Sequence, residues 1–257
     1  MIYDKFTVVM LSAINSMDAD STNAIIAKYI LENRDKVKDI GIKELAERTH
    51  VGTGSISRFC RAIGLFDFTE LKALINDFNP SIDDKLSDMP FDERMVAWHK
   101  KVSDSISKDM LKVNQKKISL LCKDIEKYDK VSAFGLLKAE SAAINLQVDL
   151  MPFHKQIYTA VSIADQFSHI VSSDENTLII IFSYTGSYFD YSDVRAHVSD
   201  IKKPKIWMIC STDTELPPFV NDTIRFSSSH ELCTHPYQLE AIESMIALEY
   251  TSLYFSK

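Results

Sequence analysis

The sequence is poor in the residues that interrupt regular secondary structure. Its 257 residues include six glycines and seven prolines. An all-β sandwich or barrel is rich in turns built from these residues, so the composition favours helices joined by short connections. Hydrophobic residues make up 46% of the chain, which is more than a disordered protein carries. The length suits one large domain or two domains of ordinary size.

Long apolar runs, paired cysteines and an excess of positive charge are also missing. The longest run of aliphatic and aromatic residues, Leu178–Phe182, is far shorter than the ~20 residues of a membrane span. Residues 1–17 show no signal-peptide cleavage pattern. Neither the histidines nor the cysteines have metal-ligand spacing, so we expect a cytoplasmic protein with reduced thiols, no membrane contact, no metal and no cofactor. The cysteines are Cys60, Cys122, Cys210 and Cys233.

A change of pattern divides the chain into two domains. Residues 79–94 hold two prolines, two serines and five acidic residues, which is typical of a linker. Before them, apolar residues recur at helical spacing in residues 1–17, 20–30, 42–49, 53–63 and 68–78. After them, a helical stretch at 102–128 precedes short apolar runs that alternate with helices. We predict an all-α domain over residues 1–79, a linker over 80–104, and an α/β domain with a three-layer parallel sheet over 105–257.

The strands predicted for the second domain are short and almost wholly apolar. This composition is expected when helices cover both faces of a parallel sheet. The predicted strands are residues 130–134, 156–158, 177–182, 205–210 and 223–226, and the predicted helices are 140–151, 163–171, 187–201 and 236–255.

Residues 42–64 have the pattern of a helix-turn-helix unit. Ala46 is small enough for two helices to cross closely, and Ile56 follows ten residues later, at a suitable spacing. The second helix is expected to begin near Thr53. His50 stands at a turn position that needs φ > 0, a conformation that histidine tolerates better than most residues. The apolar residues that close the corner are expected to be Leu45, Val51, Ile56, Phe59 and Ile63.

The start of that second helix is suited to a DNA groove. Small hydroxyls and arginines at a helix N-terminus contact phosphates and base edges. The net charge of the chain is −7, but residues 49–65 contain two arginines and no acidic residue. The pattern alone leaves open a plain helical bundle that binds no DNA. The candidate DNA-binding residues are Lys43, Thr53, Gly54, Ser55, Ser57, Arg58 and Arg61.

This domain resembles the RpiR family of bacterial transcriptional regulators. In that family an Ile-x-x-Leu-Ala helix and a Thr-Ile-x-Arg-Phe recognition helix precede a Gly-Phe-x-Glu-Leu-Lys helix. The resemblance rests on residues 42–51, 55–59, 63–64 and 68–72. Residues 65–68 depart from the last motif, and Gly52 replaces the usual serine N-cap, which weakens the start of the helix. The resemblance implies that the domain binds DNA.

A hydroxyl-rich turn follows the predicted strand at 177–182. Ser183, Thr185 and Ser187 place three hydroxyls where a strand passes into a helix, and Gly186 lets the backbone come close to a ligand. Ligands of open α/β sheets lie at the carboxyl ends of strands, and the free N–H groups of a helix N-terminus attract anions. The turn is therefore a candidate phosphate site. Ser187 and Asp190 also fit a capping box, so simple capping stays an equal alternative.

The second domain resembles the SIS (sugar isomerase) domain of RpiR-like regulators. The SIS signature includes a strand that ends in Ser-x-Ser/Thr-Gly, which residues 183–186 match. The resemblance implies a flavodoxin-like sheet, dimerisation and binding of a phosphorylated sugar. The family often has Gly-x-Gly-x-Ser after the first strand, whereas residues 135–139 read Gly-Leu-Leu-Lys-Ala; Leu137 is expected to narrow the site. The candidate phosphosugar-binding residues are Gly135, Lys138, Ser183, Thr185, Gly186 and Ser187.

The resemblance implies a DNA-binding transcriptional regulator of sugar metabolism that senses a phosphorylated sugar and is not an enzyme. The expected partners are a palindromic double-stranded operator, the sugar, and further copies of the chain in a homodimer or homotetramer. Phe6, Val9 and Met10 have no obvious place in so small a helical domain, so we expect them in the subunit interface.

Two alternatives remain open at this stage. One is an isomerase-like enzyme, for which Glu231 and His235 are the candidate acid/base residues. The other is a SIS dimerisation platform that has lost its ligand. The sequence leaves open which sugar is sensed, which operator is read, and whether binding represses or activates.

Overall fold

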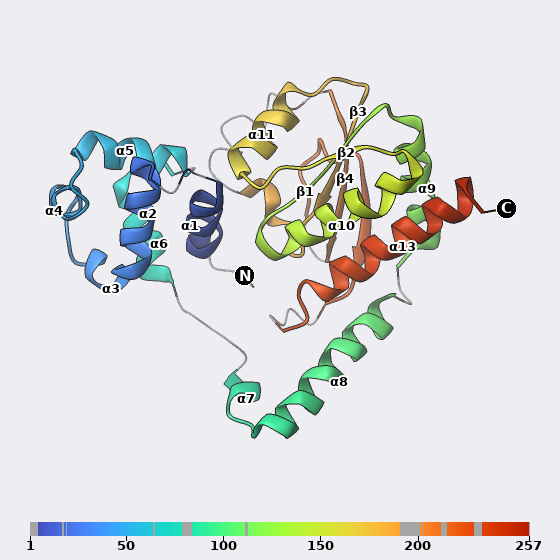
Figure 1. The fold of residues 1–257 in the computed structure, drawn as a ribbon, viewed down its shortest axis with the longest axis horizontal. Coiled ribbons are helices and arrows are strands. Elements are labelled where there is room, and N and C mark those ends of the chain that lie inside the picture. The colour runs from blue at the N-terminus through green and yellow to red at the C-terminus, as the bar shows by residue number, and fades with distance from the viewer. Residues whose placement is uncertain are drawn as a thin grey trace.

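The structure, a computed structural model, contains an all-α unit followed by an α/β unit (Figure 1). This two-part architecture agrees with the predicted fold class. The structure describes residues 5–16, 18, 20–63, 65–78, 84–110, 113–190, 201, 203–211, 215–228 and 233–256.

The helices of the all-α unit begin near the residues that the sequence indicated. Ser21 caps the second helix by accepting a hydrogen bond from the backbone N–H of Ala24 at 3.1 Å. Asp67 caps the last helix by accepting from the N–H groups of Thr69 and Glu70. Such caps satisfy backbone donors that have no partner within the helix. The helices are α1 (Lys5–Ser16), α2 (Thr22–Glu32), α3 (Arg34–Val37), α4 (Ile42–Arg48), α5 (Thr53–Ala62) and α6 (Phe68–Asp77).

The core of the all-α unit includes one face of α1. Phe6, Val9 and Met10 are buried in the same cluster as Ile26 of α2 and Phe59 of α5. The expectation that these three side chains lack a place in the helical domain is therefore wrong. The face of α1 that packs inside this unit consists of Phe6, Val9, Met10 and Ala13, which follow the i, i+3, i+4, i+7 spacing of one helix face.

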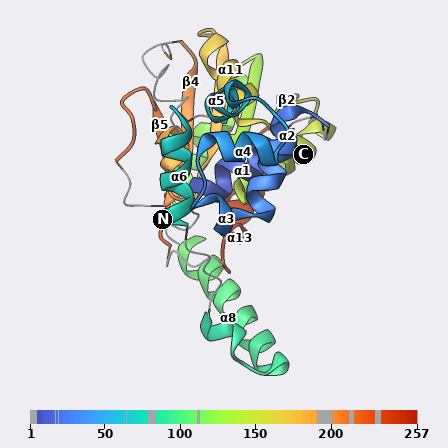
Figure 2. The same cartoon turned by 90° about the vertical axis from the view of Figure 1, so that its left-hand side faces the viewer.

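The region predicted as a linker is largely helical. Helices α7 (Asp84–Ser87) and α8 (Phe91–Met110) occupy most of it. One end of α8 extends beyond the rest of the molecule (Figure 2), while Trp98 of α8 contacts Tyr237 of α13, with 5.9 Å between the ring centroids. No proline or glycine interrupts residues 91–110, so a helix that starts after Pro90 can continue through them. The predicted helix at 102–128 is two helices. The second, α9 (Gln115–Lys127), begins at Asn114, whose side chain accepts from the Lys116 N–H at 3.0 Å.

The α/β unit is built on one parallel sheet with the strand order β2-β1-β3-β4-β5. This is the flavodoxin-like order, in which the ligand site lies where β1 and β3 diverge at their carboxyl ends. The strands are β1 (Lys130–Gly135), β2 (Ile157–Tyr158), β3 (Thr177–Phe182), β4 (Lys205–Ser211) and β5 (Asp222–Phe226). The helices are η1 (Leu137–Ala139), α10 (Glu140–Leu150), η2 (Met151–Phe153), α11 (Ile163–Ser172), η3 (Ser187–Asp190) and α13 (Tyr237–Tyr254).

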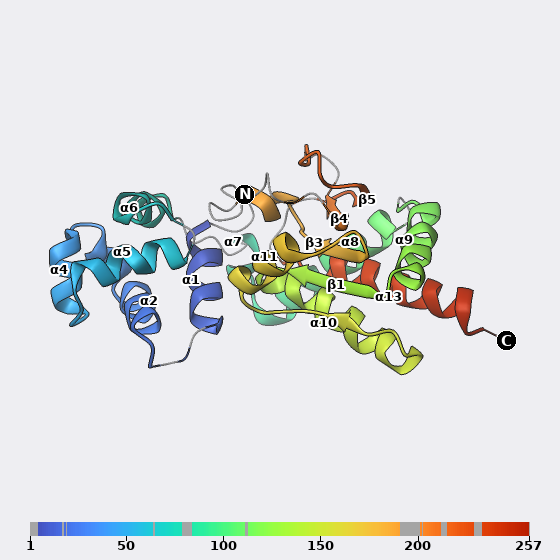
Figure 3. The same ribbon diagram turned by 90° about the horizontal axis from the view of Figure 1, so that it is seen from above.

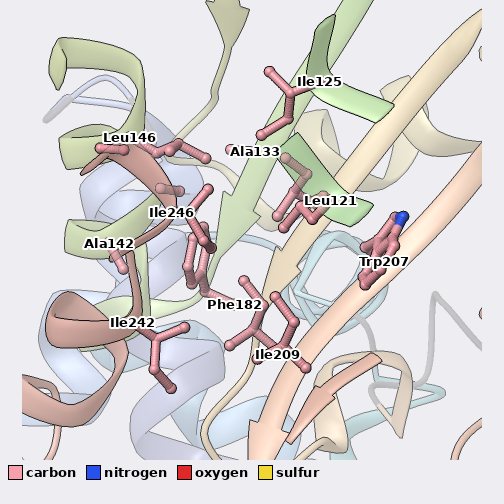
Figure 4. Packing of buried hydrophobic residues seen from close by; sticks show 14 of the residues in the cluster. Leu121, Ile125, Ala133, Ala142, Leu146, Phe182, Trp207, Ile209, Ile242 and Ile246 are labelled. Carbon is pink, nitrogen blue, oxygen red and sulfur yellow. The ribbon is translucent and has the colours of Figure 1, made fainter. Parts of the chain in front are cut away.

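Side chains of β3 alternate between two hydrophobic cores. Leu178, Ile180 and Phe182 pack with α9, α10 and α13, whereas Ile179 and Ile181 pack with α11 on the opposite face. Figure 4 shows the first core, in which Phe182 lies among Ala142 and Leu146 of α10 and Ile242 and Ile246 of α13. Every residue of β3 is buried, which explains why its sequence is continuously apolar.

The predicted helix at 187–201 is seen only in part. Residues 187–190 form the 3-10 helix η3, and residues 191–200 lie outside the described residues. Within the described ranges, no helix is long and apolar enough to cross a membrane. The same residues contain no group of three or more His, Cys, Asp and Glu side chains that could hold a metal ion.

Candidate functional site

Helices α4 and α5 form the predicted corner. Leu45, Ala46, Ile56 and Phe59 are buried, and Ile63 is 5% exposed. Val51 is partly buried against the same cluster, and its N–H donates to the carbonyl of Ala46 at 2.9 Å. These contacts hold the two helices in the crossed arrangement that a helix-turn-helix unit requires.

The turn between α4 and α5 has the backbone that the sequence indicated. His50 has a φ of 55°, the left-handed conformation expected four residues after Ala46. Gly52 is the N-cap of α5 and offers no side chain to accept a hydrogen bond, so the first N–H groups of α5 lack a side-chain cap. Unpaired N–H groups at a helix start are suited to contact an anion such as a phosphate.

The start of α5 presents an exposed, positively charged surface. Thr53, Gly54 and Arg58 are exposed, and so are Lys43 of α4 and Arg61. The Arg58 guanidinium donates to Ser55 Oγ at 3.0 Å, and Ser57 Oγ donates to the Thr53 carbonyl at 3.2 Å. Among the described residues, no acidic side chain forms a salt bridge with any of these three cations.

A neighbouring arginine on α4 is differently placed. Arg48 donates to Glu44 Oε1 at 2.6 Å and 3.0 Å and lies near the hydroxyl of Tyr29. Its charge is therefore balanced within the domain, unlike the charges of Arg58 and Arg61. The positive surface at α5 is local, which is how a chain with a net charge of −7 can offer a site for a polyanion.

The second candidate site lies at the carboxyl ends of β1 and β3. Gly186 has a φ of 75°, and its N–H donates to the Ser183 carbonyl at 3.0 Å, which closes the turn after β3. Thr185 Oγ1 and Ser187 Oγ lie 2.6 Å apart and share a hydrogen bond. The turn is tied to β4, because the Ser183 N–H donates to the Ile209 carbonyl at 3.0 Å.

A small pocket brings three of the predicted hydroxyls together. Its volume is ≈ 40 Å³. Ser183, Thr185 and Ser187 line it, whereas Gly135, Lys138 and Gly186 are not among its lining residues. The other lining residues are Val8, Leu136, Ala139, Phe182, Tyr184, Tyr188 and His235. A larger cavity of ≈ 700 Å³ at the opposite, amino-terminal side of β1 and β3 contains none of the predicted residues.

The loop after β1 faces this pocket through residues other than those predicted. Leu136 and Ala139 line the pocket, and Leu137, which we expected to narrow it, does not. Gly135 is required by the fold, because a Cβ at this position would lie 2.4 Å from the carbonyl oxygen of Ala139. Leu137 has a φ of 53°, so it keeps a left-handed conformation at the place of the family's second glycine.

The described residues that line this pocket carry no formal charge at neutral pH. His235 is 2% exposed, and burial together with the nearby charge of Lys138 lowers its pKa to about 3. Its ring lies 4.4 Å from the ring of Tyr184. The neutral imidazole, the three hydroxyls and the backbone N–H groups can together hydrogen-bond an anion, but none of the lining side chains neutralises its charge.

Several lining residues were not predicted from the sequence. Tyr188 is held by a hydrogen bond to Gln166 Oε1 at 2.8 Å, and Gln166 Nε2 donates to the Gly135 carbonyl at 2.9 Å. This chain of contacts ties the turn after β3 to the loop after β1. His235 was considered as an acid/base residue and not as a pocket residue, and its partner in that hypothesis, Glu231, lies outside the described residues.

Comparisons with known proteins agree with the sequence pattern of the all-α unit. Residues 9–81 match the family described as "Helix-turn-helix domain, rpiR family". An uncharacterized HTH-type transcriptional regulator of Caldanaerobacter subterraneus is 46% identical over 68 residues, which are 26% of this chain and 24% of that protein. The HTH-type transcriptional regulator GlvR of Bacillus subtilis is 25% identical over 165 residues, which are 63% of this chain and 60% of GlvR. The matches thus span less than two thirds of either relative.

Solved structures share the fold at low sequence identity. NanR of Vibrio vulnificus, complexed with ManNAc-6P, superposes with a TM-score of 0.55 and 14% identity, covering 97% of this chain and 92% of NanR. The sugar isomerase domain of an RpiR transcription factor from Sphaerobacter thermophilus gives a TM-score of 0.50 and 13% identity, covering 62% of this chain and 89% of that one. The α/β unit therefore has the fold of a SIS domain.

Proposed function

We propose that this chain, whose residues 9–81 are an RpiR-family helix-turn-helix domain, is a transcriptional regulator that reads a DNA operator and senses a phosphorylated sugar. The observation that carries the proposal is the exposed start of α5 within that domain. It combines an uncapped helix N-terminus, small hydroxyls and cations that no described acidic side chain pairs. A helix with these properties can enter the major groove and contact phosphates and base edges.

The residues that read DNA in this proposal lie on one surface. Arg58 contacts a guanine edge or a phosphate, and the hydroxyls of Ser55 and Ser57 face the groove. Gly54 has open space around it, since a Cβ there would meet nothing within 4 Å, and so leaves room for the DNA backbone. The full set is Lys43, Thr53, Gly54, Ser55, Ser57, Arg58 and Arg61.

The effector site in this proposal is the pocket at the carboxyl ends of β1 and β3. Ser183, Thr185 and Ser187 bind the phosphate, the backbone at Gly186 and Gly135 allows a close approach, and Lys138 on the neighbouring loop supplies a positive charge near the pocket. Support comes from the turn geometry and from the position of the pocket at the ligand side of a flavodoxin-like sheet. The structural neighbour NanR, whose fold spans both units of this chain, was solved with the sugar phosphate ManNAc-6P bound.

The α/β unit acts without turning over its ligand. Isomerisation of a sugar phosphate needs a general acid and base close to the substrate. The described lining residues include no carboxylate, and His235 is held neutral by its low pKa. The protein works as a homodimer or homotetramer, and two-fold symmetry matches a palindromic operator. Incubation with aldose and ketose phosphates is expected to give no interconversion, and measurable turnover would replace the regulator by an enzyme.

The decisive experiment is a DNA mobility-shift assay with Arg58→Ala. The operator is first selected from random duplexes with the wild-type protein. Loss of a base-reading arginine should weaken binding by about 1–3 kcal/mol at fixed salt, with the helical content and oligomeric state unchanged. The matched control is Lys28→Ala on α2, an exposed cation of the same domain that should bind like the wild type. Unchanged affinity of Arg58→Ala would show that another face of the domain reads DNA.

A further inference from the structure

Helix α1 is buried over a wider arc than the face that packs inside its own domain. One face, formed by Phe6, Val9, Met10 and Ala13, belongs to the core of the helix-turn-helix domain. Val8 lies about 150° around the helix from the centre of that face and Ser12 about 110°, since each residue advances by 100°. They are nevertheless 3% and 4% exposed. A helix at the surface of a domain normally keeps a polar face toward water, so this second burial needs a partner.

The partner of the second face is the α/β unit. Helix α1 lies between the other helices of its own domain and the α/β unit (Figures 1 and 3), and it contacts η1. Val8 is itself a lining residue of the effector pocket, together with Leu136 and Ala139 from the loop after β1 and the three hydroxyls of the turn after β3. A side chain of the DNA-binding domain thus forms part of the wall of the candidate effector site.

The pocket that α1 helps to line is too small for a sugar phosphate. Sites for small molecules enclose about 300–1,000 Å³, whereas this pocket has a volume of ≈ 40 Å³. A volume this small holds water but not a sugar phosphate. The turn after β3 is hydrogen-bonded to β4, and the loop after β1 is hydrogen-bonded to Gln166 of α11 through the Gly135 carbonyl, so neither moves aside easily. Of the elements that line the pocket, α1 is the one that belongs to a separate domain.

We infer that α1 seals the effector pocket, so that docking of the helix-turn-helix domain on the α/β unit and binding of a sugar phosphate exclude each other. This inference rests on the proposed function and specifies its regulation. The ligand must displace α1 to enter, and α1 carries the whole DNA-binding domain with it through Phe6, Val9 and Met10. Effector binding therefore releases the helix-turn-helix domain from its docked position on the α/β unit. Because coupling between two sites is reciprocal, docking also weakens effector binding.

The consequence for DNA binding follows from where the reading surface lies. Helix α4 is on the side of the domain away from the α/β unit, and α5 runs from the α4 side toward α1 (Figures 1 and 3), so docking leaves α4 and the start of α5 accessible. In a dimer, two docked domains hold their reading helices at a fixed separation, which a palindromic operator can match. Undocked domains lose this fixed separation. The sugar phosphate is therefore expected to weaken operator binding.

The test uses the full-length variant Val8→Gln, which places a polar amide in the sealed pocket and leaves the face that packs in the domain core untouched. Hydrogen exchange without ligand should become faster in residues 135–139 and 183–188, because these backbones lose their cover. The matched control is Ile25→Gln on α2, where an exposed β-branched residue of the same domain receives the same side chain. Its exchange should equal that of the wild type. Val8→Ala, which removes two methyl groups, is a milder second variant and should shift the exchange in the same direction.

The second measurement is titration calorimetry with glucose 6-phosphate, fructose 6-phosphate and ManNAc-6P. The apparent affinity falls by the fraction of molecules in the competent, undocked state, so Val8→Gln should bind a sugar phosphate about tenfold more tightly if nine tenths of the wild type is docked. Ile25→Gln should match the wild type. In the wild type, the same ligand should accelerate exchange in α1 while it protects residues 183–188.

The possible failures are distinguishable. Equal exchange in Val8→Gln and the wild type would show that α1 does not cover the pocket, which overturns the inference whatever the ligand does. A sugar phosphate that binds both proteins equally tightly would uphold the proposed function and overturn the competition. Faster exchange in Val8→Gln without binding of any sugar phosphate to either protein would overturn the sensing function and leave α1 as a plain interdomain contact.

Discussion

The two loops that flank the candidate effector pocket follow neighbouring strands but differ in the residue that each places at a positive φ. The turn after β3 puts a glycine, Gly186, at its positive φ of 75° and three hydroxyls around it. The loop after β1 puts a leucine, Leu137, at a φ of 53° and contributes the apolar side chains of Leu136 and Ala139 to the pocket. The turn after β3 has a glycine at its positive φ and polar side chains toward the pocket. The loop after β1 also has a positive φ, but it has a leucine there and only apolar side chains toward the pocket.

This difference shows that the conformation of the first loop is set by packing and not by local preference. A leucine in the left-handed region is unfavourable by about 1–2 kcal/mol, so contacts elsewhere must compensate. Gly135 sits against the carbonyl of Ala139, and the Ala139 N–H donates to the Leu136 carbonyl at 3.1 Å. The loop is therefore part of the scaffold, while the turn after β3 carries the polar groups.

The largest expected effect concerns the scaffold role of the first loop. Gly135→Ala places a Cβ within 2.4 Å of backbone, which must shift, so the free energy of unfolding of the α/β unit should fall by about 3 kcal/mol or more. Gly54→Ala is the matched substitution in open space on α5 and should raise the stability of the helical domain by about 0.5–1 kcal/mol. Urea unfolding followed by far-UV circular dichroism measures both. Equal effects of the two substitutions would remove the distinction between a packed and an open glycine.

The second prediction concerns the polar role of the turn after β3. Replacing Ser183 and Thr185 together by alanine removes two hydrogen bonds to a charged phosphate, at ~1.5 kcal/mol each, so effector affinity should fall about 100-fold. The response of operator binding to the effector should disappear, while DNA affinity without effector stays near the wild-type value. Shift assays with and without a sugar phosphate give both quantities. Ser252→Ala, an exposed hydroxyl on α13, is the control, and a double variant that still responds would place the sensing site elsewhere.

The third prediction tests whether burial in the pocket keeps the His235 ring unprotonated. His235 has a pKa of about 3 in the folded protein against an ordinary value of 6.5. Between these values the unfolded chain binds a proton that the folded protein does not bind, so this contribution to stability is present above pH 6.5 and is lost as the pH falls toward 3. The loss amounts to at most about 1.4 kcal/mol per pH unit.

Urea unfolding of His235→Gln between pH 6.5 and 4.5 measures this contribution. The variant should lose stability less steeply than the wild type as the solution becomes acidic. His99→Gln changes an exposed histidine on α8 and should keep the wild-type slope. Equal slopes for all three proteins would mean that the ring of His235 is open to water and that the pocket is not sealed.

The smallest expected effect concerns Leu137. Leu137→Gly relieves the left-handed strain and loses only partly buried side-chain contacts, so the variant should be at least as stable as the wild type, within about 1 kcal/mol. Leu137→Val keeps an apolar side chain but is β-branched, which disfavours a positive φ, and should lose about 1 kcal/mol. Thermal unfolding ranks the three proteins. A glycine variant less stable than the valine variant would show that the contacts of the leucine outweigh its strain.

Features that depend on neighbouring residues were predictable from the sequence. Strand β3 has its predicted bounds, because a run buried on both faces is apolar throughout. The corner between α4 and α5 was predictable from Ala46, from the positive φ at His50 and from the apolar residues around them. The start of the helix at 91–110 was not predicted, because its acidic residues continue the composition of a linker although no glycine or proline interrupts them.

Features that depend on distant contacts were not predictable in the same way. The sequence of α1 did contain one signal, since Lys5 is the one charged residue between residues 5 and 16, which leaves the helix without a charged face. That signal indicates a second buried face but does not say what covers it. The expected answer was a second subunit, whereas the structure places Phe6, Val9 and Met10 in the domain core and Val8 in the lining of the candidate effector pocket.

The sequence by itself determined the strands, the helix-turn-helix corner and the hydroxyl-rich turn, because periodicity, capping and backbone preference act over a few residues. The tertiary structure decided which of the predicted residues share a pocket, that His235 is buried beside them, and that α1 closes the site. Those outcomes arise from the packing of segments that are far apart in the chain, where many weak contacts compete and no single spacing in the sequence records which of them prevail.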